Sequence, residues 1–261
     1  MLSNIVQWLI EWNIVFAGFL GSLLAGLATG LGALPVLVLR KVPQKIIDSL
    51  LGFSAGVMLA ASFFSLIIPA LEIGGLYSVV PGFILGVLVI IIADDLIPHE
   101  HFIKGLEGEH LAKRLKRIWL FILAITLHNF PEGFAVGVSF GTESVSEAIS
   151  ITVAIGLQNA PEGLAVAFAL MSTLKYSRSY AFIIALLTGL VEPIAGLLGV
   201  VMTTLSNIIL PYALAFAAGA MIYVVSDEII PESHRLGHER YASIGLIIGF
   251  IIMMILDTWF K

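Results

Sequence analysis

Two stretches of the chain carry polar residues at matching positions inside apolar surroundings. The first, HNFPEGFAVGVSF, covers residues 128–140, and the second, QNAPEGLAVAFAL, covers residues 158–170. Both contain Asn-x-Pro-Glu-Gly, at an offset of thirty residues. Imidazole, amide and carboxylate groups form a mixed set of nitrogen and oxygen donors, which suits borderline divalent ions such as Zn²⁺, with Fe²⁺, Mn²⁺ and Cd²⁺ also compatible.

Helical geometry gathers the polar groups of each stretch. Residues three and four apart lie on one face of a helix, so His128, Asn129 and Glu132 project to the same side. The second stretch repeats this geometry with Gln158, Asn159 and Glu162. Because the loop GTESVS between the two segments is short, we expect two antiparallel neighbours whose polar faces meet.

Proline and glycine follow the asparagine in both stretches. Pro131 and Pro161 cannot donate a backbone hydrogen bond, so each is expected to free a carbonyl oxygen and kink its helix. Gly133 and Gly163 allow another helix to approach closely.

Hydrogen bonding between helices is an alternative explanation for these polar groups, and it accounts for the amides. It does not account for Glu132 and Glu162, because no Lys or Arg lies in the centre of an apolar segment. A carboxylate buried in a membrane must be protonated or face a cation, and one divalent metal would neutralise both. Glu192, in GLVEPIAG, is a third acid at membrane depth, which either completes this metal or proton site or is protonated against a backbone carbonyl.

Composition places these motifs in a membrane. Of 261 residues, 59% are hydrophobic and 12% are charged, and the mean hydropathy is +1.05, whereas about a quarter of the residues are charged in soluble domains. We therefore predict an all-α polytopic membrane protein, with one membrane domain over residues 1–261. About 20 apolar residues make a spanning helix, and eight spans are predicted, at 13–39, 46–71, 80–97, 118–140, 147–171, 181–205, 209–231 and 241–260.

The basic residues predict the orientation of these spans. Twelve of the thirteen Lys and Arg residues lie on one side, in the loops after spans 1, 3, 5 and 7. The positive-inside rule makes that side cytoplasmic, so both termini are predicted to face away from the cytosol in a plasma-membrane protein. The first dozen residues lack the features of a cleaved signal peptide and are read as a retained interfacial segment. Cysteine is absent, so thiolate ligands are excluded.

Segments that resemble each other also run in opposite directions. The spans carrying the doubled motif are one such pair, and AGVMLAASFFSLIIP at 55–69 resembles AGAMIYVVSDEIIP at 218–231 once one residue is inserted. We expect inverted repeats, with spans 1–3 and 6–8 arranged around the pair formed by spans 4 and 5. Inverted repeats with polar, proline-interrupted helices near the midplane indicate the binding site of a transporter.

The doubled motif on spans 4 and 5 resembles the ZIP zinc/iron permeases, specifically their GufA-like branch, and the resemblance covers essentially the whole chain. It implies a metal site formed by His128, Glu132, Gln158 and Glu162. It implies a second site, bridged to the first by the two glutamates, formed by Asn129, Glu132, Asn159, Glu162 and Glu192. Some relatives carry Asp where this chain has Asn159, which makes the second site less anionic here.

The resemblance also implies a moving bundle of spans 1, 4, 5 and 6 against spans 2, 3, 7 and 8, a homodimer, and metal movement toward the cytosol. Positions at the cytoplasmic exit in the family match Asp94, His99, His101 and Glu228. His99, His101 and His110 follow span 3, and His234 and His238 follow span 7, so these histidines are either part of an exit relay or ordinary loop residues.

The function predicted from these observations is a divalent metal permease, most simply for Zn²⁺, that works by alternating access. A Walker-type phosphate loop is absent, and neither a resident cofactor nor a nucleic-acid partner is expected. Two alternatives stay open at this stage. One is a proton-coupled carrier in which the glutamates titrate, and the other is an intramembrane metalloenzyme, although the chain lacks His-Glu-x-x-His.

Overall fold

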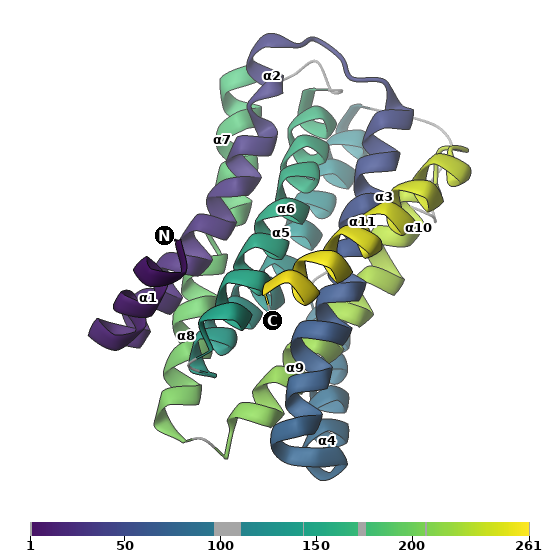
Figure 1. Ribbon diagram of the computed structural model, residues 1–261. Helices are drawn as coiled ribbons and strands as arrows, with labels where there is room; N and C mark the ends of the chain where they lie inside the picture. Colours follow the sequence, from purple (N-terminus) through teal and green to yellow (C-terminus); the bar gives the residue numbers. More distant parts are fainter. Residues whose placement is uncertain (1, 97–110, 143, 172–175, 207, 261) are drawn as a thin grey trace.

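A computed structural model of the chain describes residues 2–96, 111–142, 144–171, 176–206 and 208–260. Within these ranges every regular element is helical, and none is a strand (Figure 1). Six helical stretches are long and apolar enough to cross a membrane: Asn13–Val38, Gln44–Ala93, Val145–Met171, Arg178–Leu205, Leu210–His234 and Glu239–Trp259. The prediction of an all-helical protein with membrane-spanning helices agrees with this architecture.

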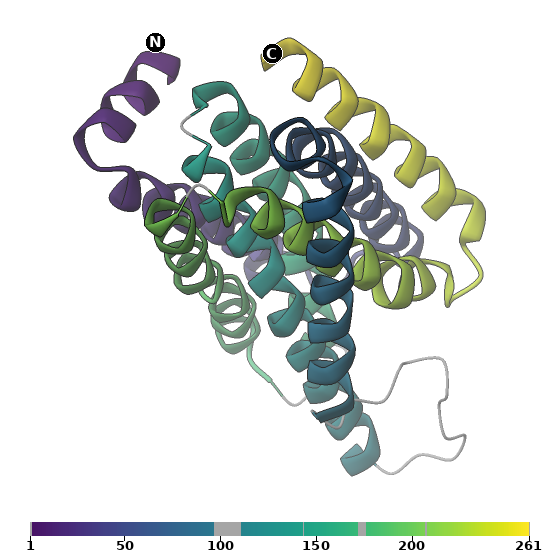
Figure 2. The ribbon, with the colours of Figure 1, turned by 90° about the horizontal axis from the view of Figure 1, so that it is seen from below.

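The first helix has two arms. Helix α1 (Leu2–Ala33) is broken at Asn13, whose φ of −164° and ψ of 100° are extended. The Oδ1 atom of Asn13 accepts a hydrogen bond of 3.0 Å from the backbone N–H of Phe16, so this side chain caps the longer arm. Figure 2 shows the short N-terminal arm bent away from the longer one. The short helix α2 (Pro35–Val38) follows.

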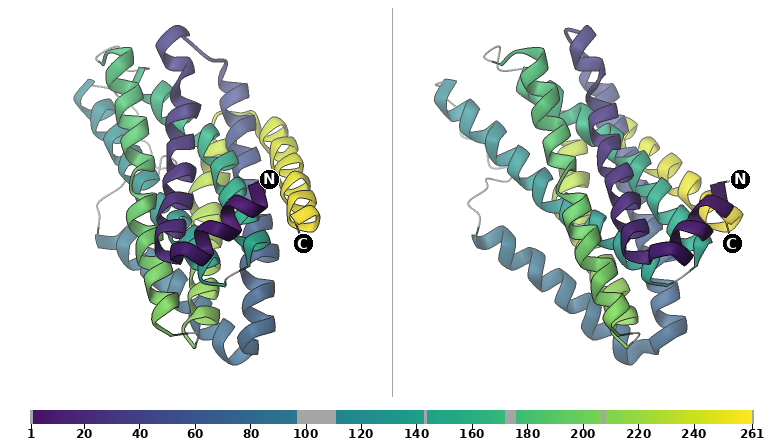
Figure 3. Two further views of the ribbon diagram at one scale, coloured as in Figure 1. Left: turned by 60° about the vertical axis from the view of Figure 1, so that its left-hand side comes forward. Right: turned by 90° about the vertical axis from the view of Figure 1, so that its left-hand side faces the viewer.

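A long helical stretch reverses direction at a glycine. Helix α3 (Gln44–Ala61) continues through a π-helical segment, η1 (Ser62–Ile67), into α4 (Ile68–Leu96). Gly75, inside α4, has φ 62° and ψ −171°, a conformation that glycine adopts readily because it lacks a Cβ atom. The two limbs diverge from this turn in Figure 3.

A second π-helical segment interrupts a later helix. Helix α9 (Leu210–Val224) runs through η3 (Val225–Ile229) into α10 (Ile230–His234). Each π segment ends two residues before a proline, Pro69 in one case and Pro231 in the other. The two π segments therefore occupy the same place in the two resembling stretches at 55–69 and 218–231. Single π turns inside α-helices occur frequently at functional sites.

The remaining helices complete two packed groups. They are α5 (Leu111–Gly141), α6 (Val145–Met171), α7 (Arg178–Gly189), α8 (Glu192–Leu205) and α11 (Glu239–Phe260). Helix α1 packs along α6 and α8, and α5 packs along α8, whereas α3 packs along α11 and α4 along α9. The two groups meet where α6 contacts α3 and where α5 contacts α9 (Figure 1).

Small residues bring the helices of the first group close together. Helices α5 and α6 run through Pro131 and Pro161 without interruption. A Cβ atom added at Gly133 would overlap the backbone of Glu192 in α8, and one added at Gly163 would overlap the backbone of Thr29 in α1. The close helix approach predicted at these two glycines is therefore confirmed.

We expect Gly163→Ala to destabilise the protein by about 1–3 kcal/mol, because the added methyl group must push α1 away from α6. Gly156→Ala, on the same helix, is the matched control: its Cβ would meet only the Cβ of Ala28, at 3.8 Å. The control should keep its stability or gain up to about 1 kcal/mol from helix propensity. Thermal unfolding of both variants in detergent measures the difference, and equal melting temperatures would show that the contact does not matter.

Candidate metal site

The two motifs predicted to face each other do so. His128 and Glu132 come from α5 and Glu162 from α6, and one ligand atom from each lies within 4.8 Å of the others. His128 Nε2 is 3.3 Å from Glu162 Oε2. All three side chains are at most 1% exposed. The arrangement places one nitrogen donor and two carboxylate donors next to one another, and these three groups can form part of the ligand set of a metal site.

Gln158 joins this cluster through Glu132. Its Nε2 atom donates a hydrogen bond of 2.5 Å to Glu132 Oε1. The Oε1 atom of Gln158 and the Oε2 atom of Glu132 are buried and have no hydrogen-bond partner in the described part of the chain. The hydrogen bond therefore fixes both side chains and leaves one oxygen of each available.

Asn159 extends the polar cluster to Glu192. Its Nδ2 atom donates to the backbone oxygen of Ala25 at 2.9 Å and to Glu192 Oε1 at 2.7 Å. Glu192 is fully buried at the first residue of α8, where the helix that began as α7 is interrupted. An acid in the first turn of a helix is stabilised by the helix dipole. Both N–H groups of the Asn159 amide are therefore used in hydrogen bonds, whereas its Oδ1 atom has no hydrogen-bond partner among the described residues.

Asn129 lies beside Glu132 on α5 and is 1% exposed. Neither of its amide atoms has a hydrogen-bond partner among the residues that the structure describes.

Five side-chain oxygens of these residues share one property: they are buried acceptors without a donor in the described ranges. They are Asn129 Oδ1, Glu132 Oε2, Gln158 Oε1, Asn159 Oδ1 and Glu192 Oε2. Burying an oxygen without a partner is costly, and buried polar atoms in proteins are nearly always paired. Buried, unpaired oxygens on three helices are therefore candidate donors for a cation.

Two further residues reach this cluster from the other helix group. Ser54 of α3 donates a short hydrogen bond from its Oγ to Glu162 Oε1. Glu228, in the π segment η3, places Oε2 3.5 Å from His128 Nδ1. Ser54 was not predicted, and its sequence signal is weak: a small polar residue directly before the repeated stretch at 55–69. Glu228 was predicted as an exit residue, and it lies next to the central cluster.

The other predicted exit residues are not described at the side-chain level. His99 and His101 lie outside the described residues, and Asp94 belongs to α4 without a described side chain.

The two histidines after span 7 have other partners. His238 Nδ1 is 2.8 Å from Oδ2 of the buried Asp48 in α3. His234 Nδ1 is 2.8 Å from the backbone oxygen of Ile230, within its own helix. The contact between His238 and Asp48 ties the turn between α10 and α11 to the start of α3.

A family model described as "ZIP Zinc transporter" matches residues 98–257, which include both motifs and Glu192. The chain belongs to the ZIP family. The family resemblance drawn from the paired motifs is therefore confirmed.

Relatives cover nearly all of this ZIP chain. Zinc transporter GufA of Myxococcus xanthus is 48% identical over 92% of the chain and 98% of its own length. Zinc transporter ZIPB of Bordetella bronchiseptica is 45% identical over 99% of the chain and 86% of its own length. Zinc transporter ZIP11 of Homo sapiens is 36% identical over 94% of the chain and 97% of its own length.

Proposed function

We propose that this ZIP protein carries divalent metal ions, Zn²⁺ in particular, across the membrane into the cytosol. The observation that carries the proposal is the convergence of His128, Glu132 and Glu162 in a buried cluster between two membrane helices. The names of the relatives, all zinc transporters, support Zn²⁺ as the substrate. The same nitrogen and oxygen donors are also compatible with Cd²⁺, Fe²⁺ and Mn²⁺.

The proposed primary site takes its ligands from two helices: His128, Glu132, Gln158 and Glu162. The proposed adjoining site shares the two glutamates and adds Asn129, Asn159 and Glu192. The buried, unpaired oxygens on Asn129, Gln158, Asn159 and Glu192 support these residues as ligands, because each oxygen can accept a metal. The metal is substrate at both sites, so the protein acts as a transporter and not as an enzyme.

Alternating access is the proposed mechanism. Two contacts cross between the helix groups at the metal cluster: Ser54 with Glu162, and Glu228 with His128. If one group moves against the other, these two contacts must break and re-form. Ser54 and Glu228 would then contact the metal ligands differently in the state open to the outside and in the state open to the cytosol. We propose that Glu228 then passes metal to an exit formed with Asp94, His99 and His101.

Several features of the assembly belong to the same proposal. Eight helices cross the membrane if the stretch Gln44–Ala93 crosses twice, with its turn at Gly75, and if α5 adds one more crossing. The matching positions of η1 and η3 support inverted repeats around the α5 and α6 pair. The distribution of Lys and Arg supports an orientation with both termini outside the cytosol, and the plasma membrane is the proposed location. The protein is proposed to act as a homodimer.

Transport is tested with purified protein in liposomes that contain a zinc-sensitive dye. Added Zn²⁺ should raise the dye signal faster than in protein-free liposomes, without ATP. A protein that binds Zn²⁺ but gives no rise in the dye signal above that of protein-free liposomes would contradict zinc transport.

We expect metal affinity to fall as the pH is lowered from about 8 to 5, because His128 must lose its proton and the glutamates must be ionised before they can ligate a metal. Each bound metal should release protons, so the affinity is lost on the acidic side. Titration of the detergent-solubilised protein with Zn²⁺ at several pH values measures this dependence. An unchanged affinity across the range would contradict ligation by these groups.

A further inference from the structure

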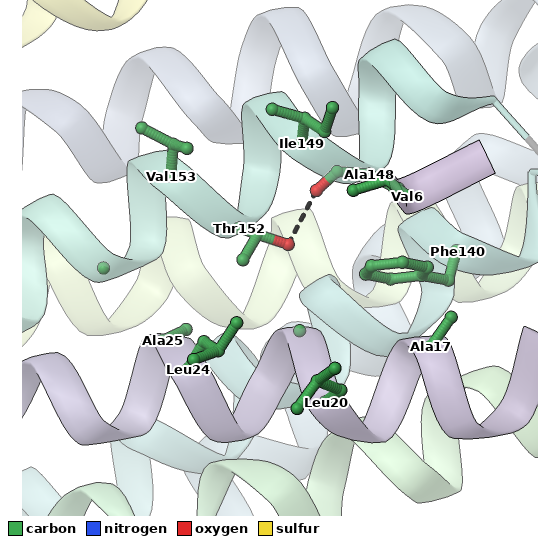
Figure 4. A pocket seen from close by; sticks show the side chains of 12 residues that line it. Val6, Ala17, Leu20, Leu24, Ala25, Phe140, Ala148, Ile149, Thr152 and Val153 are labelled. Atoms are coloured by element: carbon green, nitrogen blue, oxygen red, sulfur yellow. Dashed lines mark hydrogen bonds between the residues drawn. The ribbon is translucent and has the colours of Figure 1, made fainter. Parts of the chain in front are cut away.

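An apolar crevice lies between the long arm of α1, the end of α5 and the first half of α6 (Figure 4). Its volume is about 300 Å³. The side chains that line it include Leu20 and Leu24 from α1, Phe140 from α5, and Ile149 and Val153 from α6. It is separate from the metal cluster, whose polar residues are absent from its lining.

The side chains that line the crevice are apolar, with one exception. Thr152 carries the one hydroxyl among them, and its Oγ1 donates a hydrogen bond of 2.6 Å to the backbone oxygen of Ala148 (Figure 4). A metal ion, water or a charged headgroup would lose hydration in this crevice and gain no partner. A hydrocarbon chain has no such cost.

The crevice has the depth of one membrane leaflet. On α6 it extends from Ala148, near the turn after α5, to Gly156, eight residues later, which is about 12 Å along a helix. At its inner end lies Ala25, whose backbone oxygen accepts the hydrogen bond from Asn159 at the metal cluster. The hydrocarbon core of a bilayer is about 30 Å thick, so one leaflet is about 15 Å.

The crevice reaches the surface of the protein beside Leu24, which lines it next to Ala25 and is 57% exposed. Val6, from the short arm of α1, borders it at the end where that arm bends away at Asn13. Trp8 on the same arm is 59% exposed, and tryptophan is enriched at the level of the lipid headgroups.

We propose that this crevice binds one acyl chain of a phospholipid from the surrounding leaflet. Its lining is apolar over about 12 Å of α6, which matches the part of an acyl chain that lies within one leaflet.

The bound chain would support the geometry of the metal cluster. It packs against α1 and α6, the two helices that the hydrogen bond between Ala25 and Asn159 joins, so it adds contact between them. The proposal depends on membrane embedding and not on transport of metal. Failure of the lipid test and failure of the transport test are therefore distinguishable.

Photolabelling of the full chain in phosphatidylcholine vesicles tests the proposal. The probe is a phosphatidylcholine with a diazirine in the middle of one acyl chain, and labelled positions are mapped by peptide mass spectrometry. The reference surface is the exposed face of α4 at Ile84, Leu85 and Leu88, which reports ordinary lipid contact. We expect the crevice segments 17–25 and 148–156 to be labelled more strongly per residue than this reference face.

Gly156→Leu fills the crevice, because a Cβ atom at this position meets only Ala28 Cβ at 3.8 Å. Labelling of the crevice should fall to less than half, with the reference face unchanged, whereas Gly156→Ala should change it little. Val153→Phe fills the same space and serves if Gly156→Leu does not yield folded protein. Crevice labelling that equals the reference face in the wild type, or that survives filling of the crevice, would overturn the proposal.

A second labelling experiment separates the phospholipid from a free fatty acid. The probe is a fatty acid that carries the same diazirine. Labelling of the crevice by this fatty acid, with none by the phospholipid, would contradict the proposed occupant.

Discussion

Glu162→Gln is expected to abolish zinc uptake into liposomes and to weaken metal binding by more than about 100-fold. Glu162 stands at the centre of the cluster: one oxygen accepts from Ser54, and the other lies 3.3 Å from His128 Nε2. The amide keeps the size of the side chain and removes its charge. Loss of a residue that only orients a metal ligand already costs about 10- to 100-fold in affinity, so loss of a ligating charge should cost more.

Glu147→Gln is the matched control, because Glu147 lies in the first turn of the same helix, away from the cluster. This variant should transport zinc at close to the wild-type rate. Expression level and elution as a single folded species must be the same for both variants. Uptake by Glu162→Gln near the wild-type rate would show that the metal does not pass through this site.

Asn159→Asp is expected to raise the affinity of a second metal ion and to destabilise the metal-free protein. Two dications beside Glu132, Glu162 and Glu192 bring four positive charges against three negative ones, and the aspartate would supply the fourth. The substitution also removes both N–H donors of the amide and points a carboxylate oxygen at Ala25 O and Glu192 Oε1. Each acceptor left without a donor costs about 1–3 kcal/mol. A metal ion between the carboxylates would cancel this repulsion.

Elemental analysis and zinc titration at one pH give the metal content, and thermal unfolding with chelator or with zinc gives the stability. The wild type should bind one metal tightly and a second weakly. The aspartate variant should melt lower than the wild type in chelator and gain more from zinc. Asn159→Ala removes the same donors without adding a charge, so it should melt lower and gain no second metal. Two equally tight metals in the wild type, with no change in the aspartate variant, would show that charge here does not control occupancy.

The sequence by itself determined the class of the protein and the core of the candidate site. Apolar segments of spanning length follow from composition, because a membrane excludes charged side chains from its interior. The polar faces of α5 and α6 follow from helical spacing, which is a local property. The short loop between these helices then brings His128 and Glu162 together, so the cluster could be predicted without knowledge of distant contacts.

Only the tertiary structure decided which distant groups complete the cluster. Ser54 lies 108 residues from Glu162 in the chain, and no spacing rule relates them. The direction of the Asn159 amide, toward Ala25 and Glu192, depends on how closely α1 and α8 approach α6. Glu228 reaches His128 from a π-helical turn, whose extra residue per turn changes the face on which a side chain lies. The crevice beside α1 is likewise a tertiary feature, because it is a space that the side chains of three helices leave unfilled.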